Sequence, residues 1–234
     1  MVKGIIYYTD NRIEDPINSM VQKYILESEL PIVSTSLKPI NFGRNIVVEG
    51  ERGYPTMIKQ IVTALEWSGS DYVFFCEHDV LYHKSHFDFT PPRDDMFYYN
   101  TNDWRWDYPN DRVIRYNGLS SLSQMCCNRK LALNHFRKRL EKIQEHPELF
   151  SSREPDTARK WGYEPGTKKR RKGGFSDEES GRWSSDCPNV DIRHHGTFSP
   201  NKTTLEGFKH QPTGWEETTL DKIEGWDLKG LFNL

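Results

Sequence analysis

The sequence predicts an α/β fold with a mostly parallel central sheet flanked by helices. Within the first 80 residues, short runs of β-branched and aromatic residues alternate with longer segments that carry apolar residues at helical spacing. Strands that alternate with helices favour right-handed crossover connections and therefore a parallel sheet. Hydrophobic residues make up 35% of the 234 residues and aromatic residues 13%, which is enough for one folded core.

The first two strands enclose a helix. Residues 3–8, KGIIYY, form an apolar run typical of a buried strand, and the polar turn TDNR follows at residues 9–12. Residues 16–30 place apolar side chains at helical spacing and end before Pro31, which cannot continue a helix. A second strand is expected from Ile32 onward.

The next helix and strand lead to an acidic triplet. Residues 55–67 carry an apolar helical face, and residues 71–76, DYVFFC, predict a strand that is buried on both faces. The triplet EHD at residues 77–79 follows directly. Because ligands of open parallel sheets bind outside the carboxyl ends of the strands, the triplet and the turn at residues 9–12 are expected at one edge.

The remainder of the chain has a weaker pattern. Further elements are expected at three places: a strand at residues 96–100, a short strand or turn at 120–127, and a helix at 129–144. Residues 151–185 are charged and are interpreted as a long loop with one basic run, KKRRK. The whole chain, residues 1–234, is expected to form a single domain, with residues 206–234 wrapping the sheet.

Composition excludes several classes of function. A formal charge of −2 gives no overall attraction to nucleic acid or anionic lipid. No apolar stretch approaches the roughly 20 residues of a membrane span, and the N-terminus does not resemble a signal peptide, so a cytoplasmic protein is expected. The four cysteines lack CxxC spacing, which favours reduced thiols over structural zinc or disulfides: Cys76, Cys126, Cys127 and Cys187.

Carboxylates and histidines indicate a metal site. Side chains at i and i+2 of an extended segment point the same way, so Glu77 and Asp79 could share one Mg²⁺ or Mn²⁺, which prefers oxygen ligands. In DIRHHG, Ile192 suggests a short strand that brings one of two adjacent histidines to the same edge, and His194 is favoured over His195. The HxxH pair in YHKSH could alternatively bind zinc or pack within a loop.

Three segments, YYTDN, FFCEHDVLY and DIRHHG, resemble in order and spacing glycosyltransferases of the glycosyltransferase-A fold. In that family an Asp-x-Asp-like motif holds a divalent cation on the donor diphosphate. The resemblance covers about residues 1–205. It implies a Rossmann-like half that binds a nucleotide sugar (residues 1–100) and an acceptor half with a metal histidine (residues 101–205), followed by a C-terminal extension (residues 206–234).

The resemblance also implies roles for individual residues. Asp79 becomes the metal ligand, Glu77 a second ligand or a sugar contact, and His194 a further ligand or diphosphate contact. Three residues match the loop that grips the donor's base and ribose: Thr9, Asp10 and Asn11. The implied cofactors are Mn²⁺ or Mg²⁺ and a nucleotide-diphosphate sugar, with a UDP-sugar favoured.

The implied reaction is displacement at the anomeric carbon of a hexosyl or related sugar. An inverting enzyme would need a carboxylate to accept the proton of the acceptor hydroxyl, and Asp177 and Glu164 are the candidates. Residues 102–108, NDWRWDY, could be an acceptor surface or ordinary packing. The run KKRRK could hold phosphates of a lipid-linked or nucleic-acid acceptor, although nothing else indicates nucleic acid.

Two other functions stay open at this point. A zinc-dependent hydrolase or deacetylase would use four residues around the metal: His78, Asp79, His83 and His86. A non-catalytic module would bind a nucleotide sugar without turning it over. The sequence does not select the sugar, the acceptor, the stereochemistry or the oligomeric state.

Overall fold

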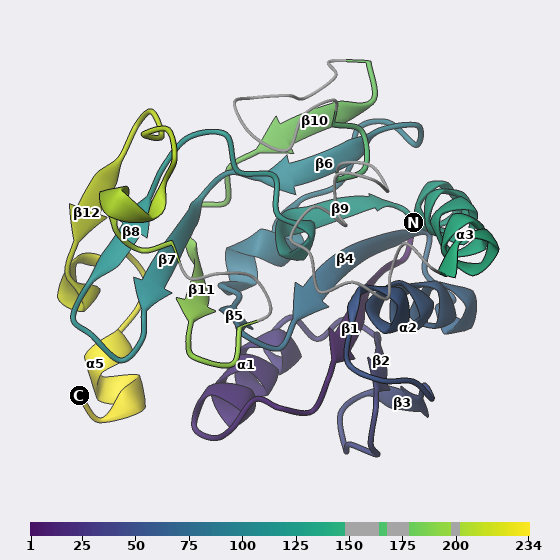
Figure 1. The fold of residues 1–234 in the computed structure, drawn as a ribbon, viewed down its shortest axis with the longest axis horizontal. Coiled ribbons are helices and arrows are strands. Elements are labelled where there is room, and N and C mark those ends of the chain that lie inside the picture. Colours follow the sequence, from purple (N-terminus) through teal and green to yellow (C-terminus); the bar gives the residue numbers. More distant parts are fainter. Residues whose placement is uncertain (148–163, 168–177, 198–201) are drawn as a thin grey trace.

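The computed structural model describes residues 1–147, 164–167, 178–197 and 202–234, which contain two sheets (Figure 1). The first has the strand order β10-β6-β9-β4-β1-β2-β3. Its strands are β1 (Lys3–Thr9), β2 (Ile32–Ser36), β3 (Arg44–Val47), β4 (Tyr72–Glu77), β6 (Phe97–Asn100), β9 (Met125–Asn128) and β10 (Ser180–Trp183). The second sheet, ordered β12-β8-β7-β11-β5, consists of β5 (Val80–Leu81), β7 (Asp103–Asp107), β8 (Val113–Arg115), β11 (Asn189–Arg193) and β12 (Glu216–Thr218).

The first sheet is mostly parallel, which confirms the predicted fold class. Strand β1 pairs in parallel with β2 and β4, β2 with β3, and β6 with β10, whereas β9 runs antiparallel between β4 and β6. The chain moves outward from β1 to β2 and β3, then returns to place β4 on the other side of β1. The strand order therefore reverses between β1 and β4, where ligands of such sheets bind.

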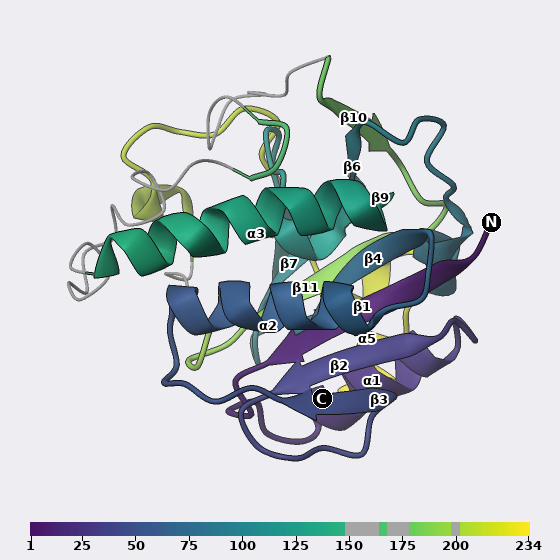
Figure 2. The ribbon, with the colours of Figure 1, turned by 90° about the vertical axis from the view of Figure 1, so that its right-hand side faces the viewer.

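Hydrophobic layers cover both faces of this sheet. In the described part of the chain, the α-helices are α1 (Ile17–Leu26), α2 (Tyr54–Trp67), α3 (Arg129–Glu145) and α5 (Leu228–Phe232). Helices α2 and α3 lie side by side on one face, where they pack against Ile6 and Tyr8 of β1 (Figure 2). On the other face, Ile5 and Tyr7 belong to a cluster that also contains residues of α1, the second sheet and α5. The alternation along β1 thus assigns successive side chains to the two layers.

The expected elements of the first 80 residues are confirmed, but several strands were missed. Strand β3 was not predicted, β10 lies within residues 151–185, and of the second sheet only β11, the short strand around Ile192, was expected. These strands are short and carry polar residues, as in RNIV of β3 and DWRWD of β7. Their hydrogen-bond partners are distant in sequence, so local patterning cannot reveal them. The run KKRRK lies outside the described residues.

Two expectations about the whole chain can be compared with the structure. No helix in the described ranges combines the length and apolar character that a membrane crossing requires. All four cysteines lie in the described part, and each is a free thiol, as the spacing predicted. Three of them are buried within the first sheet, where they act as small apolar side chains.

His135 on α3 should make stability depend on pH. Burial lowers its pKa to about 3, so between pH 6.5 and 3 the unfolded chain binds this proton and the folded chain does not. As the pH falls from 6 to 4, we expect the unfolding free energy of His135→Gln to rise relative to that of wild type. The expected change is up to about 1.4 kcal/mol per pH unit.

Urea unfolding at pH 7, 6, 5 and 4 would measure this difference. The exposed His210 offers the matched substitution His210→Gln, which controls for the loss of a histidine at the surface. A pH-independent difference for His135→Gln would contradict the prediction.

Candidate functional site

A pocket with about 590 Å³ of empty space, including its open mouth, lies where the strand order reverses. The end of β1, the start of α2 and the acidic triplet after β4 form most of its walls. It is lined by Tyr8, Thr9, Asp10, Leu37, Arg52, Gly53, Thr56, Met57, Gln60, Glu77, His78 and Asp79. The two polar segments that were expected at one edge of the sheet therefore meet in one cavity.

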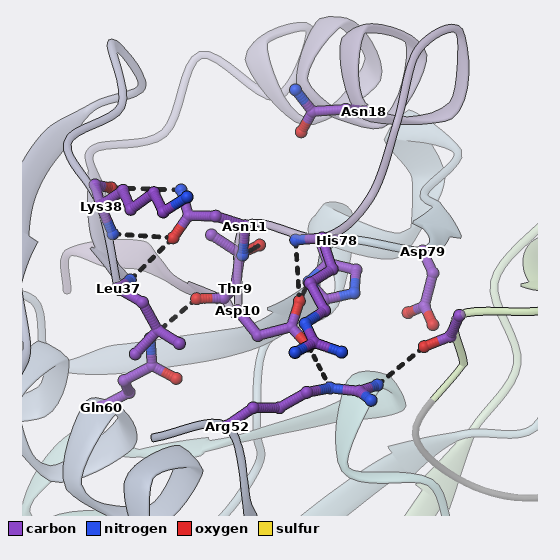
Figure 3. A network of polar contacts seen from close by, with 12 residues as sticks. Thr9, Asp10, Asn11, Asn18, Leu37, Lys38, Arg52, Gln60, His78 and Asp79 are labelled. Carbon is purple, nitrogen blue, oxygen red and sulfur yellow. Dashed lines mark hydrogen bonds and ion pairs between the residues drawn. The ribbon is translucent and has the colours of Figure 1, made fainter. Parts of the chain in front are cut away.

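The loop after β1 is fixed by hydrogen bonds to its own backbone and to its neighbours (Figure 3). The carbonyl of Thr9 accepts a hydrogen bond from Gln60 Nε2 at 2.8 Å, and its hydroxyl accepts from the backbone N–H of Asn11 at 3.0 Å. The side-chain oxygen of Asn11 accepts from the backbone N–H groups of Leu37 and Lys38, at 2.7 and 2.9 Å. Asn11 therefore holds the loop after β2 and does not itself line the pocket.

Asp10 reaches the pocket from the same loop and is paired with a residue that sequence reasoning missed. Arg52 Nε donates to Asp10 Oδ2 at 2.5 Å, and Arg52 Nη2 donates to the carbonyl of Gly196 at 2.7 Å (Figure 3). His78 Nδ1 lies 4.0 Å from Asp10 Oδ1. Arg52 thus joins the loop after β1 to the loop after β11. The sequence signal for it was a basic residue just before a helix start, where anions bind.

Glu77 lines the pocket from the end of β4. It is the last residue of β4 and stands in register with Tyr8 of β1, whose hydroxyl donates to Glu77 Oε1 at 2.6 Å. Burial, reinforced by the charge of Asp79, raises the pKa of Glu77 to about 8. Since two carboxylates in one cavity repel each other, a cation beside them would stabilise both charges.

Asp79 lies close to Glu77 for a different reason from the one predicted. The strand ends at Glu77 and a turn follows, so the alternation of an extended chain does not orient Asp79. Instead, the Asp79 carbonyl accepts a hydrogen bond from the N–H of Ile192 at 2.8 Å, which fixes the turn to β11. The Asp79 residue is 7% exposed, and burial raises its pKa.

His194 directly follows β11 and faces Asp79. Its Nε2 lies 3.8 Å from Asp79 Oδ2, while its neighbour His195 is exposed, as expected for adjacent residues. Burial lowers the pKa of His194 to about 4, so the ring is neutral near pH 7. Because Nδ1 accepts a hydrogen bond from Gly196 N–H at 3.2 Å, the proton of the neutral ring is on Nε2. Metal coordination through Nε2 would require this hydrogen bond to break.

More charged side chains lie beside Asp79 than the sequence indicated. Arg193 Nη1 lies 3.2 Å from both carboxylate oxygens of Asp191, and Arg105 Nε lies 3.7 Å from Asp191 Oδ2. The charge of Asp191 in turn raises the pKa of Asp79 and of Asp103. Of the four carboxyl groups, Asp191 is paired with the two guanidinium groups, whereas burial raises the pKa of the other three, counting Glu77.

A divalent cation would favour the ionised forms of the carboxyl groups that have no guanidinium partner. Among the described residues, no three histidine, cysteine, aspartate or glutamate side chains are grouped as a ready-made metal site. Mg²⁺ and Mn²⁺ do not need such a group, because they are commonly held by one or two carboxylates, waters and substrate phosphates. The buried, mutually repelling carboxylates fit a cation of this kind.

A closed zinc site is not formed from His78, Asp79, His83 and His86. His86 is fully buried beside Phe74 and Tyr82, and burial lowers its pKa to about 3. His83 instead caps a short 3₁₀ helix, where its Nδ1 accepts from the Ser85 N–H. The structure therefore agrees with the second alternative for the HxxH pair, in which both histidines pack within a loop.

Of the two predicted proton acceptors, Glu164 lies in the described part and Asp177 lies outside it. The carbonyl of Pro165, next to Glu164, accepts a hydrogen bond from the buried hydroxyl of Tyr99 at 2.6 Å. The charge of Glu164 contributes to the raised pKa values of Tyr8 and Glu77. The 164–167 segment is therefore fixed to the first sheet through Tyr99, and Glu164 itself is not among the residues that line the pocket.

Comparison with known proteins adds the following. No protein-family model and no curated protein sequence matches this chain. Among solved structures, it is similar to the apo form of the glycosyltransferase GlyE of Streptococcus pneumoniae TIGR4, with 11% identity and a TM-score of 0.41 over 67% of this chain. It is also similar to a glycosyltransferase involved in the glycosylation of the major capsid of PBCV-1, with 9% identity and a TM-score of 0.39 over 63% of this chain.

Both of these structures are glycosyltransferases. The present chain spans 41% of the length of the GlyE chain and 69% of the PBCV-1 protein. Similarity at this level assigns no activity, substrate or metal, so a function has to be argued from the pocket itself.

Proposed function

We propose that this protein is a metal-dependent glycosyltransferase that moves a sugar from a nucleotide-diphosphate donor, with UDP favoured, to an acceptor hydroxyl. The observation that carries the proposal is the pocket between β1 and β4. It combines a polar loop with two buried carboxylates at the point where the strand order reverses.

The anionic part of the donor is proposed to lie near the start of α2. Gly53, the N-cap residue, provides no side chain to satisfy the first backbone N–H groups, and the first turn contains no acidic residue. A helix N-terminus of this kind favours phosphate, and the guanidinium of Arg52 lies beside it. The nucleoside would then contact the loop of Thr9 and Asp10.

Asp79 and Glu77 would hold the divalent cation, with His194 as a further ligand or as a hydrogen-bond donor to the diphosphate. The chemistry that such a cation supplies is neutralisation of the charge that develops on the departing nucleoside diphosphate. Asp79 is buried and Glu77 is partly buried, and the low exposure of these carboxyl groups would strengthen this electrostatic interaction.

Glu164 is the proposed acceptor of the proton from the acceptor hydroxyl. Its charge adds, after the larger effect of burial, to the raised pKa values of Tyr8 and Glu77, and this supports a position close to these two residues of the pocket wall. The second candidate, Asp177, remains a prediction from the sequence.

Calorimetric titration of UDP, GDP and their common sugar conjugates, with and without Mn²⁺, tests the proposal. We expect one nucleotide to bind tightly only with the metal, and its sugar conjugate to be slowly hydrolysed. Binding without any turnover would instead favour a non-catalytic nucleotide-sugar-binding module. Failure of every nucleotide to bind in a metal-dependent way would exclude the proposed glycosyltransferase.

A further inference from the structure

The pocket has two ends that differ in chemistry. Figure 3 shows Thr9, Leu37 and Gln60 at one side of the polar network and His78 and Asp79 at the other. The proposed function uses the second end for the cation and the diphosphate. The first end lies where α2 packs over β1 and β2, and its walls come from α2, the end of β1 and the loop after β2. The base of the donor is the group that remains for this end.

One side of α2 lines the first end. Gln60 lies three residues after Met57 and four after Thr56, so these side chains are neighbours on the helix surface, and all line the pocket. Leu37 lines it from the loop after β2, where its backbone N–H donates to the Asn11 side chain at 2.7 Å. The wall thus combines two apolar and two polar side chains. It suits a flat heterocycle, which packs its faces on apolar groups and directs its edge to polar ones.

The amide of Gln60 has a fixed orientation. The residue is 3% exposed, and Nε2 donates to the carbonyl of Thr9 at 2.8 Å (Figure 3). A carbonyl only accepts hydrogen bonds, so the amide nitrogen faces Thr9 and the oxygen Oε1 points away from it. Within the described residues, Oε1 accepts no hydrogen bond and is not one of the fully buried atoms that lack a partner. Gln60 therefore presents a hydrogen-bond acceptor to the pocket that it lines.

The two ends are separated by about the length of a nucleoside. Gln60 lies seven residues after Gly53, the N-cap of α2, which corresponds to roughly 10 Å of helix at 1.5 Å per residue. The residue before the cap, Arg52, donates to the carbonyl of Gly196 in the loop that follows His194. The start of α2 therefore belongs to the cation end. A diphosphate bound there would leave the base, which a ribose separates from it, beside Gln60.

We propose that Gln60 determines which base the donor carries, and that this base is uracil. The inference rests on the proposed function and deepens it. In uracil the ring nitrogen N3 carries a hydrogen and donates to Gln60 Oε1, whereas N3 of cytosine carries a lone pair, which an acceptor repels. The Thr56 hydroxyl, one turn earlier on α2, can donate to the adjacent uracil carbonyl. Met57 and Leu37 pack against the ring.

Calorimetric titration with UDP, CDP, GDP and N3-methyluridine diphosphate, each with Mn²⁺, tests this assignment. The methylated probe keeps both carbonyls of uracil but lacks the hydrogen on N3. We expect the Kd of wild type for CDP and for the methylated probe to exceed that for UDP by about tenfold or more, because the Gln60 oxygen is then left unpaired. These comparisons use the wild-type protein, so no substitution can disturb them.

A substitution at the amide tests the residue itself. Gln60→Met removes both polar atoms and keeps the length of the side chain. Its Kd for UDP should rise about tenfold, and the ratio of the CDP value to the UDP value should fall below about threefold. A purely structural role of the bond to Thr9 would weaken all nucleotides equally and leave that ratio unchanged. Gln22→Met is the matched control, because Gln22 on α1 bonds Asn18 and does not line the pocket.

Three results would overturn the inference. They are equal Kd values of wild type for UDP and either pyrimidine probe, tighter binding of GDP than of UDP, or an unchanged ratio in Gln60→Met. Failure of every nucleotide to bind with Mn²⁺ would instead refute the proposed function, so the two failures are distinguishable. Thermal midpoints of both variants show whether they are folded at the temperature of the titration.

Discussion

Replacing Asp79 with asparagine is expected to lower the rate of sugar transfer by at least about a hundredfold. The substitution keeps the shape of the side chain but removes the buried charge that faces His194 and would hold the cation. The affinity for UDP should become insensitive to Mn²⁺. Steady-state UDP release and calorimetry with and without Mn²⁺ measure the two effects.

Folding should survive this substitution. The Asp79 carboxylate is destabilised by burial and by the charge of Asp191, so a neutral amide at this position should leave the thermal midpoint unchanged or raise it. The matched control is Asp95→Asn, because Asp95 is exposed and precedes β6 at the edge of the sheet opposite to Glu77. Full transfer activity in Asp79→Asn would refute the role of this carboxylate.

Trp106→Ala should reduce the unfolding free energy by about 3 to 5 kcal/mol. The indole is fully buried, and its N–H donates to the carbonyl of Asn110 at 2.8 Å. Its ring centre lies 5.0 Å from that of Tyr108 and 4.8 Å from that of Phe232. Truncation removes these contacts and leaves a cavity in the second sheet. Urea unfolding followed by circular dichroism and by fluorescence measures the loss.

The same experiment tests whether the chain is a single domain, which remains a prediction. Trp106 belongs to the same hydrophobic cluster as Tyr7 of the first sheet, so both sheets should unfold in one transition with coincident probes. Trp67→Ala is the control, because Trp67 is 48% exposed and contacts Arg44 at the surface. It should cost less than about 1 kcal/mol. Two separate transitions in wild type would argue against a single domain.

The sequence by itself determined the core of the first sheet and the place of the pocket. Apolar runs such as KGIIYY and DYVFFC are buried on both faces, so their strand character follows from the residues alone. Because parallel strands end at one edge, Thr9 and Glu77 could be placed together without knowledge of any contact. This placement requires only the local pattern of apolar residues and the right-handed connections between parallel strands.

Only the tertiary structure decided which side chains complete the site. Asn11 is in the predicted loop, but two backbone N–H groups near Leu37 occupy its side-chain oxygen. Arg52 meets Gly196 through a contact that spans 144 residues. Asp103 lies near Asp191 because the short strand β7 pairs with β11, which is distant in sequence. Contacts between distant segments leave no periodic trace in the sequence, because they depend on how the two sheets pack and not on local preference.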